Sequence, residues 1–393
     1  MINMSWSFNL ALLVDGKTAI QRHIDDQYGP WKEIDLVKGE RIRMITTPSG
    51  IQVPDSLAVM TQSGRILVSH DSVVPKLEDI TSIVRGLFGL DTENIKSMRI
   101  WGYNLIILSD FSMASISLEM NEGARYTHIY RSPSEIDSVC HNFTSCSIIT
   151  TSDNRLFGTV YRKRDPLFGL AYTEPFRTVE NIRLNFLVQH ISEVRSVASH
   201  IVLLTGDGLL YGRRYNIGRH NETPFVPILS DEGVIVTKII PLCFDIIFIT
   251  AAGRLYKQRT YPEYDLAIEP LIIRELSNRM AVNVVKASGI SVVVQCAAGS
   301  SYVTYVVRMP LRANENQPDI NVIVPLYAFN NIHIVSISYW AKRIYFFTDD
   351  DAVFWSDNIE TDAPTITRDT FFDKRQLPCS KNANSIRSAL SAL

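Results

Sequence analysis

Cysteine is scarce in this sequence, and long apolar runs are missing. Five cysteines in 393 residues make an odd number spread over a long chain. That usage is typical of proteins whose thiols stay reduced, so it excludes a disulfide framework and predicts a cytoplasmic protein, with the nucleus as the alternative. We expect no signal peptide, because Asn9 interrupts the apolar N-terminal run and Asp15 and Gly16 close it.

The chain also lacks an excess of charge of either sign. Its 39 basic and 41 acidic side chains give a net charge of -2, which makes nucleic acid an unlikely partner. No window contains the roughly 18 consecutive apolar residues of a membrane helix, so we expect no membrane partner. With 46% apolar residues, 19 glycines and 17 prolines, the composition is that of a folded globular protein.

Motifs for catalysis, cofactors and metals are equally rare. Asp15-Gly16-Lys17-Thr18 resembles the end of a phosphate-binding loop, but Ala11 stands where that loop needs glycine. Cys140, His141 and Cys146 lack the second ligand pair of a zinc site, and Asp349-Asp350-Asp351 falls in an expected hairpin turn. We therefore predict no enzyme, no cofactor and no metal. An active site assembled from several repeats remains the alternative.

What the chain does contain is a repeat built on short turns. In Leu203-Leu-Thr-Gly-Asp-Gly208-Leu-Leu-Tyr211, an apolar strand reaches Thr, a turn residue follows three positions later, and an aromatic comes three positions after that. The turn positions recur about every 48 residues, the period of a repeat architecture. They are Gly16, Gly64, Ser112, Asn154, Gly208, Gly253, Gly299 and Asp351. Glycine, asparagine and aspartate suit hairpin turns that need a positive φ.

A second apolar segment precedes each turn, with hydrophobic residues three positions apart. The pairs are Ile95/Met98, Ile136/Val139, Val194/Val197, Val236/Ile239, Val282/Val285 and Ile334/Ile337. Each period thus has three short strands and room for a fourth in the proline-containing stretch that follows. The fold prediction is all-β: a seven-bladed β-propeller, with eight blades as the alternative, made of four-stranded antiparallel blades. We expect residues 1-360 to form one propeller domain and residues 361-393 a C-terminal strand and a mobile or docking tail.

The segment from Val197 to Gly218 resembles the repeat of the regulator of chromosome condensation family of seven-bladed propellers. It carries His200, the strand ending in Leu204-Thr205, Gly208, Tyr211 and a following glycine-containing loop. Histidine occupies its repeat position only there, and the equivalent residues are Asn104, Cys146, Asp245, Ser291 and Arg343. The resemblance implies a propeller that binds other proteins. It also implies guanine-nucleotide exchange on a Ran-like small GTPase as an alternative activity.

Basic residues follow the aromatic position in four successive repeats. They are Arg162, Lys163, Arg164, Arg213, Arg214, Lys257, Arg259 and Arg308, with Arg219 and Arg312 close by. Equivalent repeat positions lie on one side of a propeller, so these side chains are candidates for a basic rim that binds another protein with an acidic surface. The alternative is that they are ordinary solvated strand ends. The functional prediction is a non-enzymatic protein-protein interaction or scaffold module.

Overall fold

The computed structural model consists almost entirely of short β-strands. The residues that it describes are 2–4, 8–13, 15–24, 27–47, 56–69, 77–89, 94–101, 104–118, 127–141, 147–163, 173–197, 200–214, 223–229, 233–243, 245–259, 271–273, 276–309, 321–340, 343–357, 359, 361 and 363–373. The chain divides into two compact units. Unit 1 comprises Met1–Ile136, Ser338–Phe354 and Arg368–Leu393, and unit 2 comprises Asp137–Ile337 and Trp355–Thr367.

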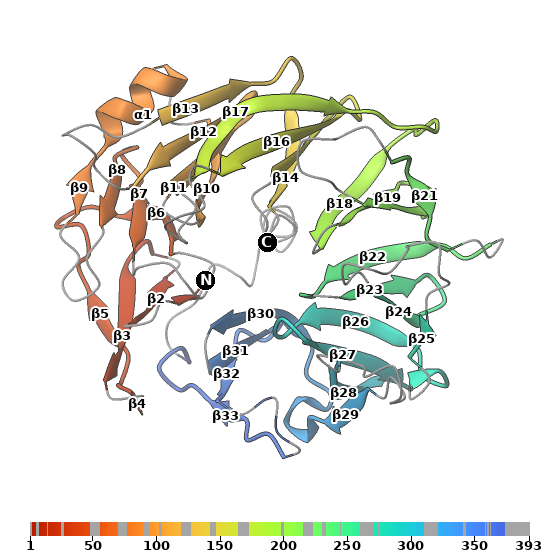
Figure 1. Cartoon of the computed structure of the whole chain (residues 1–393). Helices are drawn as coiled ribbons and strands as arrows, with labels where there is room; N and C mark the ends of the chain where they lie inside the picture. The colour runs from red at the N-terminus through yellow and green to blue at the C-terminus, as the bar shows by residue number, and fades with distance from the viewer. Residues whose placement is uncertain are drawn as a thin grey trace. The chain divides into compact units, whose positions relative to one another are not determined.

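The sheets of unit 1 come from the first part of the chain and from its last strands (Figure 1). Their elements are β1 (Ile2–Met4), β2 (Phe8–Leu12), β3 (Thr18–Ile24), β4 (Gln27–Tyr28) and β5 (Lys32–Ile34); β6 (Ile42–Thr46), β7 (Leu57–Thr61), β8 (Ile66–Ser69), β9 (Glu78–Asp79) and helix α1 (Thr81–Phe88); β10 (Ile95–Trp101), β11 (Asn104–Ser109), β12 (Ser112–Ser117) and β13 (Thr127–Arg131); and most of β30 (Ile334–Trp340), β31 (Arg343–Thr348), β32 (Val353–Ser356) and β33 (Thr367–Arg368).

Unit 2 contains the four sheets formed by the middle of the chain. Figure 1 shows these sheets following one another in chain order. Their elements are β14 (Ile136–His141), β15 (Ser147–Thr151), β16 (Leu156–Lys163) and β17 (Thr173–Ile182); β18 (Ile191–Val197), β19 (His200–Thr205), β20 (Leu210–Arg214) and β21 (Val226–Pro227); β22 (Val236–Pro241), β23 (Asp245–Thr250), β24 (Leu255–Arg259) and β25 (Leu271–Ile272); and β26 (Ala281–Lys286), β27 (Ser291–Ala298), β28 (Ser301–Arg308), β29 (Val322–Pro325) and the 3-10 turn η2 (Tyr327–Phe329).

The chain is an all-β propeller of eight blades. Seven sheets have four strands in simple chain order, and the first sheet adds a fifth strand, β5, against β3. The predicted antiparallel four-stranded repeat is confirmed, and of the two blade counts the structure has eight. Seven was the preferred count, but β1, β2, β3 and β5 form a sheet of their own rather than an appendage.

Turns between the second and third strands explain the periodic glycines. Seven of the eight predicted turn residues have a positive φ, from 62° at Asn154 to 84° at Gly208. At Thr205 the hydroxyl accepts a hydrogen bond from Leu209 N (3.0 Å) and donates one to Asp207, which closes the loop. Ser112 is the exception: it already lies in β12, and its N–H bonds the Ser109 hydroxyl instead (3.1 Å).

A β-bulge in the first strand of the blade explains why its hydrophobic residues are three apart. The pairing register shifts between Val236 and Lys238, and the extra residue puts Val236 and Ile239 on the same buried face. The same irregularity occurs in β6, β10, β18 and β26. In β26 the predicted pair Val282/Val285 is wrong by one position, because Ala281 and Val284 are the buried residues.

Hydrophobic cores lie between consecutive sheets. One core of unit 2 combines Ile247 and Leu255 of one sheet with Val284 and Val294 of the next. Backbone bonds also join neighbouring sheets: Val236 N donates to Gly208 O and Ala281 N donates to Gly253 O, each at 2.9 Å. These two turn residues thereby fix where the next blade begins.

In unit 1 the first sheet packs against residues from the end of the chain. Trp31 Nε1 donates to Asp369 Oδ2 (3.0 Å), and its ring contacts Tyr345 edge-on. Tyr345 donates its hydroxyl to Gln21, and the Arg343 guanidinium lies 3.7 Å from the centre of the Tyr28 ring. These contacts give the N-terminal sheet the structural role of a blade.

Helix α1 is the one α-helix in the described residues. Among the residues that the structure places, none belongs to a helix with the length and apolar character needed to cross a bilayer. Pro364 and the strand β33 fall in the predicted C-terminal segment. Residues beyond 373 lie outside the described part, so the predicted tail stays a prediction.

Candidate interaction surface

The basic residues predicted from the repeat do occupy equivalent positions in unit 2. Arg214, Arg259 and Arg308 end the third strands of three consecutive sheets. Their cross-strand partners His200, Asp245 and Ser291 begin the second strands. The repeat alignment therefore located these residues correctly along the strands.

Two of the predicted residues are buried. Arg213 is 3% exposed, and its guanidinium lies 5.0 Å from the centre of the Phe225 ring. Lys257 is also 3% exposed, and its Nζ donates to Asn321 Oδ1 (3.1 Å). Neither side chain is therefore exposed to solvent. The prediction that both lie on an exposed basic rim is wrong for these two residues. Successive strand residues point to opposite faces, so Arg213 turns inward where Arg214 turns out.

The remaining members of the set differ in environment. Arg214 is exposed, Arg308 is half-buried, and Arg259 is half-buried with its Nε 3.9 Å from Asp245 Oδ1. Arg162 and Lys163 end β16, but their side chains lie outside the described residues, as does all of Arg164, Arg219 and Arg312. The basic rim as a partner site stays a prediction.

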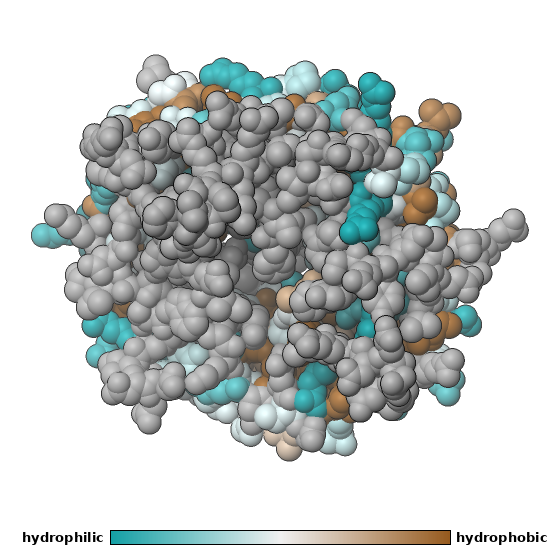
Figure 2. Space-filling view, in the orientation of Figure 1, coloured by the Kyte–Doolittle hydropathy of each residue, from teal (hydrophilic) through white to brown (hydrophobic). Residues whose placement is uncertain are grey.

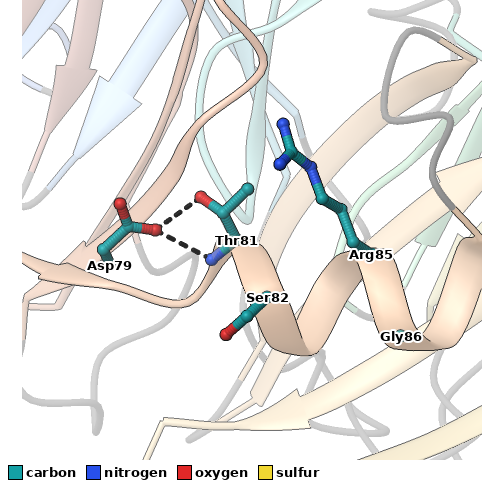
Figure 3. Close-up of a pocket in the computed structure, with 5 residues that line it drawn as sticks. All are labelled: Asp79, Thr81, Ser82, Arg85 and Gly86. Carbon is teal, nitrogen blue, oxygen red and sulfur yellow. Dashed lines mark hydrogen bonds between the residues drawn. The ribbon is translucent and has the colours of Figure 1, made fainter.

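A pocket of about 610 Å³ lies beside helix α1, lined by Asp79, Thr81, Ser82, Arg85 and Gly86 (Figure 3). Figure 3 shows Asp79 directed at Thr81, whose backbone N–H donates to Asp79 Oδ1 (2.9 Å). Although partial burial raises it, the hydrogen bonds from Thr81 and Arg65 leave the pKa of Asp79 below its ordinary value. This carboxylate is held ionised by its partners, so it is poorly suited to proton transfer near neutral pH.

The cysteines and the acidic turn considered as metal ligands have structural roles where they are described. Cys140 belongs to a hydrophobic core of unit 2, while Cys146 and the His141 side chain lie outside the described residues. Burial raises the pKa of Cys296 to about 11, so this thiol stays protonated at neutral pH. Asp350 accepts the Thr348 hydroxyl bond, and Asp351 takes the positive φ of its turn. Among the described residues no three His, Cys, Asp or Glu side chains converge as metal ligands.

The turn end of the sheets, where second strands meet third strands, is ionic in unit 1. Arg65 bridges Glu40 and Asp79, and Lys96 bridges Asp110 and Glu135, with both of the Lys96 distances at 2.8 Å. Pairs of this kind keep a surface hydrated and discourage apolar contacts.

The same end of unit 2 is apolar across three consecutive sheets. The exposed fractions are 46% for Leu209, 50% for Ile235, 53% for Met280 and 42% for Val282. Exposed alanines lie at the same end, Ala251 and Ala252 in the turn after β23 and Ala298 at the end of β27. We call these seven residues the apolar stripe. In the space-filling view of Figure 2, apolar residues of the described part reach the surface in small groups between hydrophilic ones.

Short contacts between neighbouring sheets place Ile235 and Met280 beside turns that carry or adjoin other members of the apolar stripe. A Cβ added to Gly208, the neighbour of Leu209, would lie 2.4 Å from Ile235 Cγ2. Ile235 O accepts a bond from Ala251 N (2.7 Å), and Met280 O accepts one from Ala297 N (2.9 Å). A Cβ added to Gly253 would lie 2.5 Å from Met280 Cγ. Ile235 and Met280 thus each lie between a turn of the preceding sheet and the turn end of their own sheet.

Two cations and one carboxylate flank the apolar stripe. Arg254 is exposed next to Gly253, and no described residue forms an ion pair with it. The exposed Arg279 precedes Met280, and its guanidinium lies 5.0 Å from the centre of the Tyr305 ring. Asp207 lies at the other end, beside Leu209. Among the described residues, the charged side chains near the Met280 end of the apolar stripe are therefore positive.

The signal for this surface was present in the repeat. The residue after the turn position is basic in four of the eight repeats, as Lys17, Arg65, Arg155 and Arg254. In the fifth repeat of the chain it is Leu209. Likewise Arg41 and Glu135 precede first strands where Ile235 and Met280 stand in unit 2. A comparison of exposed positions between repeats would have found the stripe, whereas a search for charged residues passed over it.

No family model and no curated protein matches this sequence. Solved structures do resemble it. Yeast RCC1 (Prp20), in its complex with Kap60, is 12% identical over 78% of this chain and 81% of its own, with a TM-score of 0.43. Human WBSCR16 is 11% identical over 72% and 83%, with a TM-score of 0.42. The computationally designed Ika8 protein is 10% identical over 90% and 93%, with a TM-score of 0.47. At these identities and TM-scores the similarities assign no partner and no activity, and the strand pairing itself identifies the chain as a β-propeller.

Proposed function

We propose that this protein is a non-enzymatic interaction module, a propeller of the regulator-of-chromosome-condensation type that docks another protein on the apolar stripe. The observation that carries the proposal is a contrast between repeats: turn positions bear ion pairs at Arg65 and Lys96 in unit 1 and at Arg155 in unit 2, whereas three other sheets of unit 2 expose Leu, Ile and Met side chains there. An exposed apolar surface is typical of a protein contact site.

The energy available supports a specific but reversible contact. Leu209, Ile235, Met280 and Val282 each keep about half of their surface in water. Burying the remainder of each contributes roughly 1 kcal/mol before the cost of association. Short turns on stable sheets hold these side chains, so a partner meets a rigid surface.

The test is affinity capture with the full-length chain, comparing wild type with the double variant Ile235→Asp, Met280→Asp. Phe111→Asp is the matched control, because Phe111 is 54% exposed at a turn of unit 1. We expect proteins captured by wild type and the Phe111 variant to be lost with the double variant. Identical capture by all three would overturn the proposal.

Guanine-nucleotide exchange is the alternative activity that the sequence resemblance implies. The longest strands of unit 2 include β17, which pairs with β16 in the sheet that contains the longest repeat interval. We propose that the extra residues between the turn positions Asn154 and Gly208, the longest interval of the repeat, lengthen the β16–β17 hairpin and are not an inserted element that acts on a GTPase. In a nucleotide-release assay with a panel of small GTPases, we expect no acceleration. A GTPase that releases nucleotide faster would replace the interaction-only proposal.

A further inference from the structure

The spacing of the apolar stripe identifies the form of the segment that fits it. This inference rests on the proposed function and goes further by naming the chemistry of the partner. Ile235 and Met280 hold equivalent positions, each one residue before the first strand of consecutive sheets. Sheets that pack face to face are about 10 Å apart, so we expect the two side chains to be separated by about that distance.

A helix matches this separation better than an extended chain does. Residues seven apart on one helix face are separated by about 10.5 Å, which is two turns. In an extended segment the third residue reaches about 10 Å but points to the opposite face, because strand side chains alternate. Only the helix presents apolar side chains to Ile235 and Met280 from a single face.

The charges beside the stripe select the polar residues of that helix. Arg254 and Arg279 are exposed at the Met280 end, and Arg254 has no ion pair among the residues the structure describes. An acidic side chain next to the apolar face of a helix would complement both. Rim pairs of this kind contribute mainly to association rate and specificity.

We propose that the apolar stripe binds an amphipathic helix of a partner protein, with Leu-like residues on one face and Glu or Asp residues flanking that face. Apolar anchors spaced along a helix and seated on a complementary surface are an established mode of peptide recognition. The apolar contacts supply most of the affinity, and Arg254 and Arg279 set the preference for acidic over basic helices.

Three synthetic peptides test this with the full-length protein. The first has three heptads with Leu at the first and fourth positions of each and Glu beside them. The second replaces each Glu by Lys, and the third scrambles the first so that the Leu residues no longer share a face. Fluorescence anisotropy of labelled peptides measures binding. We expect saturable binding of the first peptide and at least tenfold weaker binding of the other two.

Variants assign the binding to the stripe. Ile235→Asp with Met280→Asp should weaken the acidic peptide at least tenfold, while Phe111→Asp should leave it unchanged. Arg254→Glu should reduce binding of the acidic peptide and increase that of the basic one, with a shallower salt dependence for the acidic peptide. Circular dichroism of each variant checks that the sheets are intact.

Several results would overturn the inference. Equal binding of the acidic and scrambled peptides, no binding of the acidic peptide, or no reversal of preference in Arg254→Glu would each do so. So would sedimentation showing that a second copy of this chain occupies the stripe, or flotation showing that lipid vesicles do. If partner capture still depends on Ile235 and Met280 while the acidic peptide fails, the helix inference falls and the proposed function stands.

Discussion

At the residue scale, the left-handed turn residues do two things at once. Gly208 closes its hairpin with a φ of 84°, and its carbonyl accepts the first backbone bond of the next sheet. Its missing Cβ also leaves the space that Ile235 Cγ2 occupies. Asn154 performs the same joining with its side chain, whose Oδ1 accepts from Ile191 N (2.9 Å).

Comparing alanine variants of Gly208 and Gly233 separates two losses of stability: the strain of a positive φ in alanine and the clash of the added methyl with Ile235. Gly233 has a φ of 86° and no described atom within 4 Å of an added Cβ, so Gly233→Ala measures the backbone term alone. We expect Gly208→Ala to be more destabilising than Gly233→Ala by roughly 1–3 kcal/mol, because the added methyl displaces Ile235. Denaturant unfolding followed by intrinsic fluorescence provides the comparison. Equal losses would show that Ile235 moves aside freely.

At the scale of the element, the strand pattern was predictable and its details were not. The i, i+3 spacing of apolar residues indicated a strand, but only the structure shows that a bulge brings both residues to one face. Ala281 and Val284 are the buried pair of β26, yet Val282 and Val285 are the more hydrophobic pair, so composition favoured the wrong register. Arg213 is buried against Phe225, which immediately precedes β21, a contact that local sequence does not report.

Gln295 of β27 joins its sheet to the start of β30, where no backbone bond from a turn residue is described. Its Oε1 accepts from Ile334 N (3.0 Å), and its Nε2 donates to Ile332 O (2.8 Å). Gln295→Leu keeps a similar volume but leaves these backbone groups without their partner. We expect a loss of about 2–4 kcal/mol in unfolding free energy, measured by denaturant titration. A loss below about 0.5 kcal/mol would mean that water replaces the amide.

At the scale of the whole molecule, segments separated by more than 300 residues meet in unit 1. Trp31 donates to Asp369, and it also contacts Phe371 and Phe372, with ring centres 6.1 and 5.2 Å away. The number of blades depends on this contact, because it gives the first sheet a neighbour from the end of the chain. Sequence periodicity indicated the hairpin at Gly16 but could not show whether that hairpin stood alone.

Asp369 makes this contact sensitive to pH. Burial raises the pKa of Asp369 above its ordinary value, despite the bonds from Phe371 N and Trp31. A carboxyl with a raised folded pKa contributes stability that is fully present below its ordinary pKa and is lost as pH rises through the folded pKa. Asp369→Asn retains an acceptor for Trp31 but does not titrate. We expect wild type to lose stability relative to this variant as pH rises above about 4, measured as the difference in Tm.

A constant difference in Tm across that range would show that Asp369 is solvated in the folded protein. The pH range in which Asp369 affects stability differs from that of Glu40 and Asp79, whose folded pKa values are lowered. Their contribution is present above the ordinary carboxyl pKa and is lost as pH falls, so the two effects are separable on one pH titration.

The absence of a side chain at Gly208 has a consequence for recognition. Cγ2 of Ile235 fills the volume that a methyl group would take, and a β-branched side chain has few χ1 rotamers, so Ile235 has little χ1 freedom even before any ligand arrives. A side chain that is already ordered forfeits little entropy on association. The hairpin glycine thus preorganises a contact residue that belongs to the neighbouring blade.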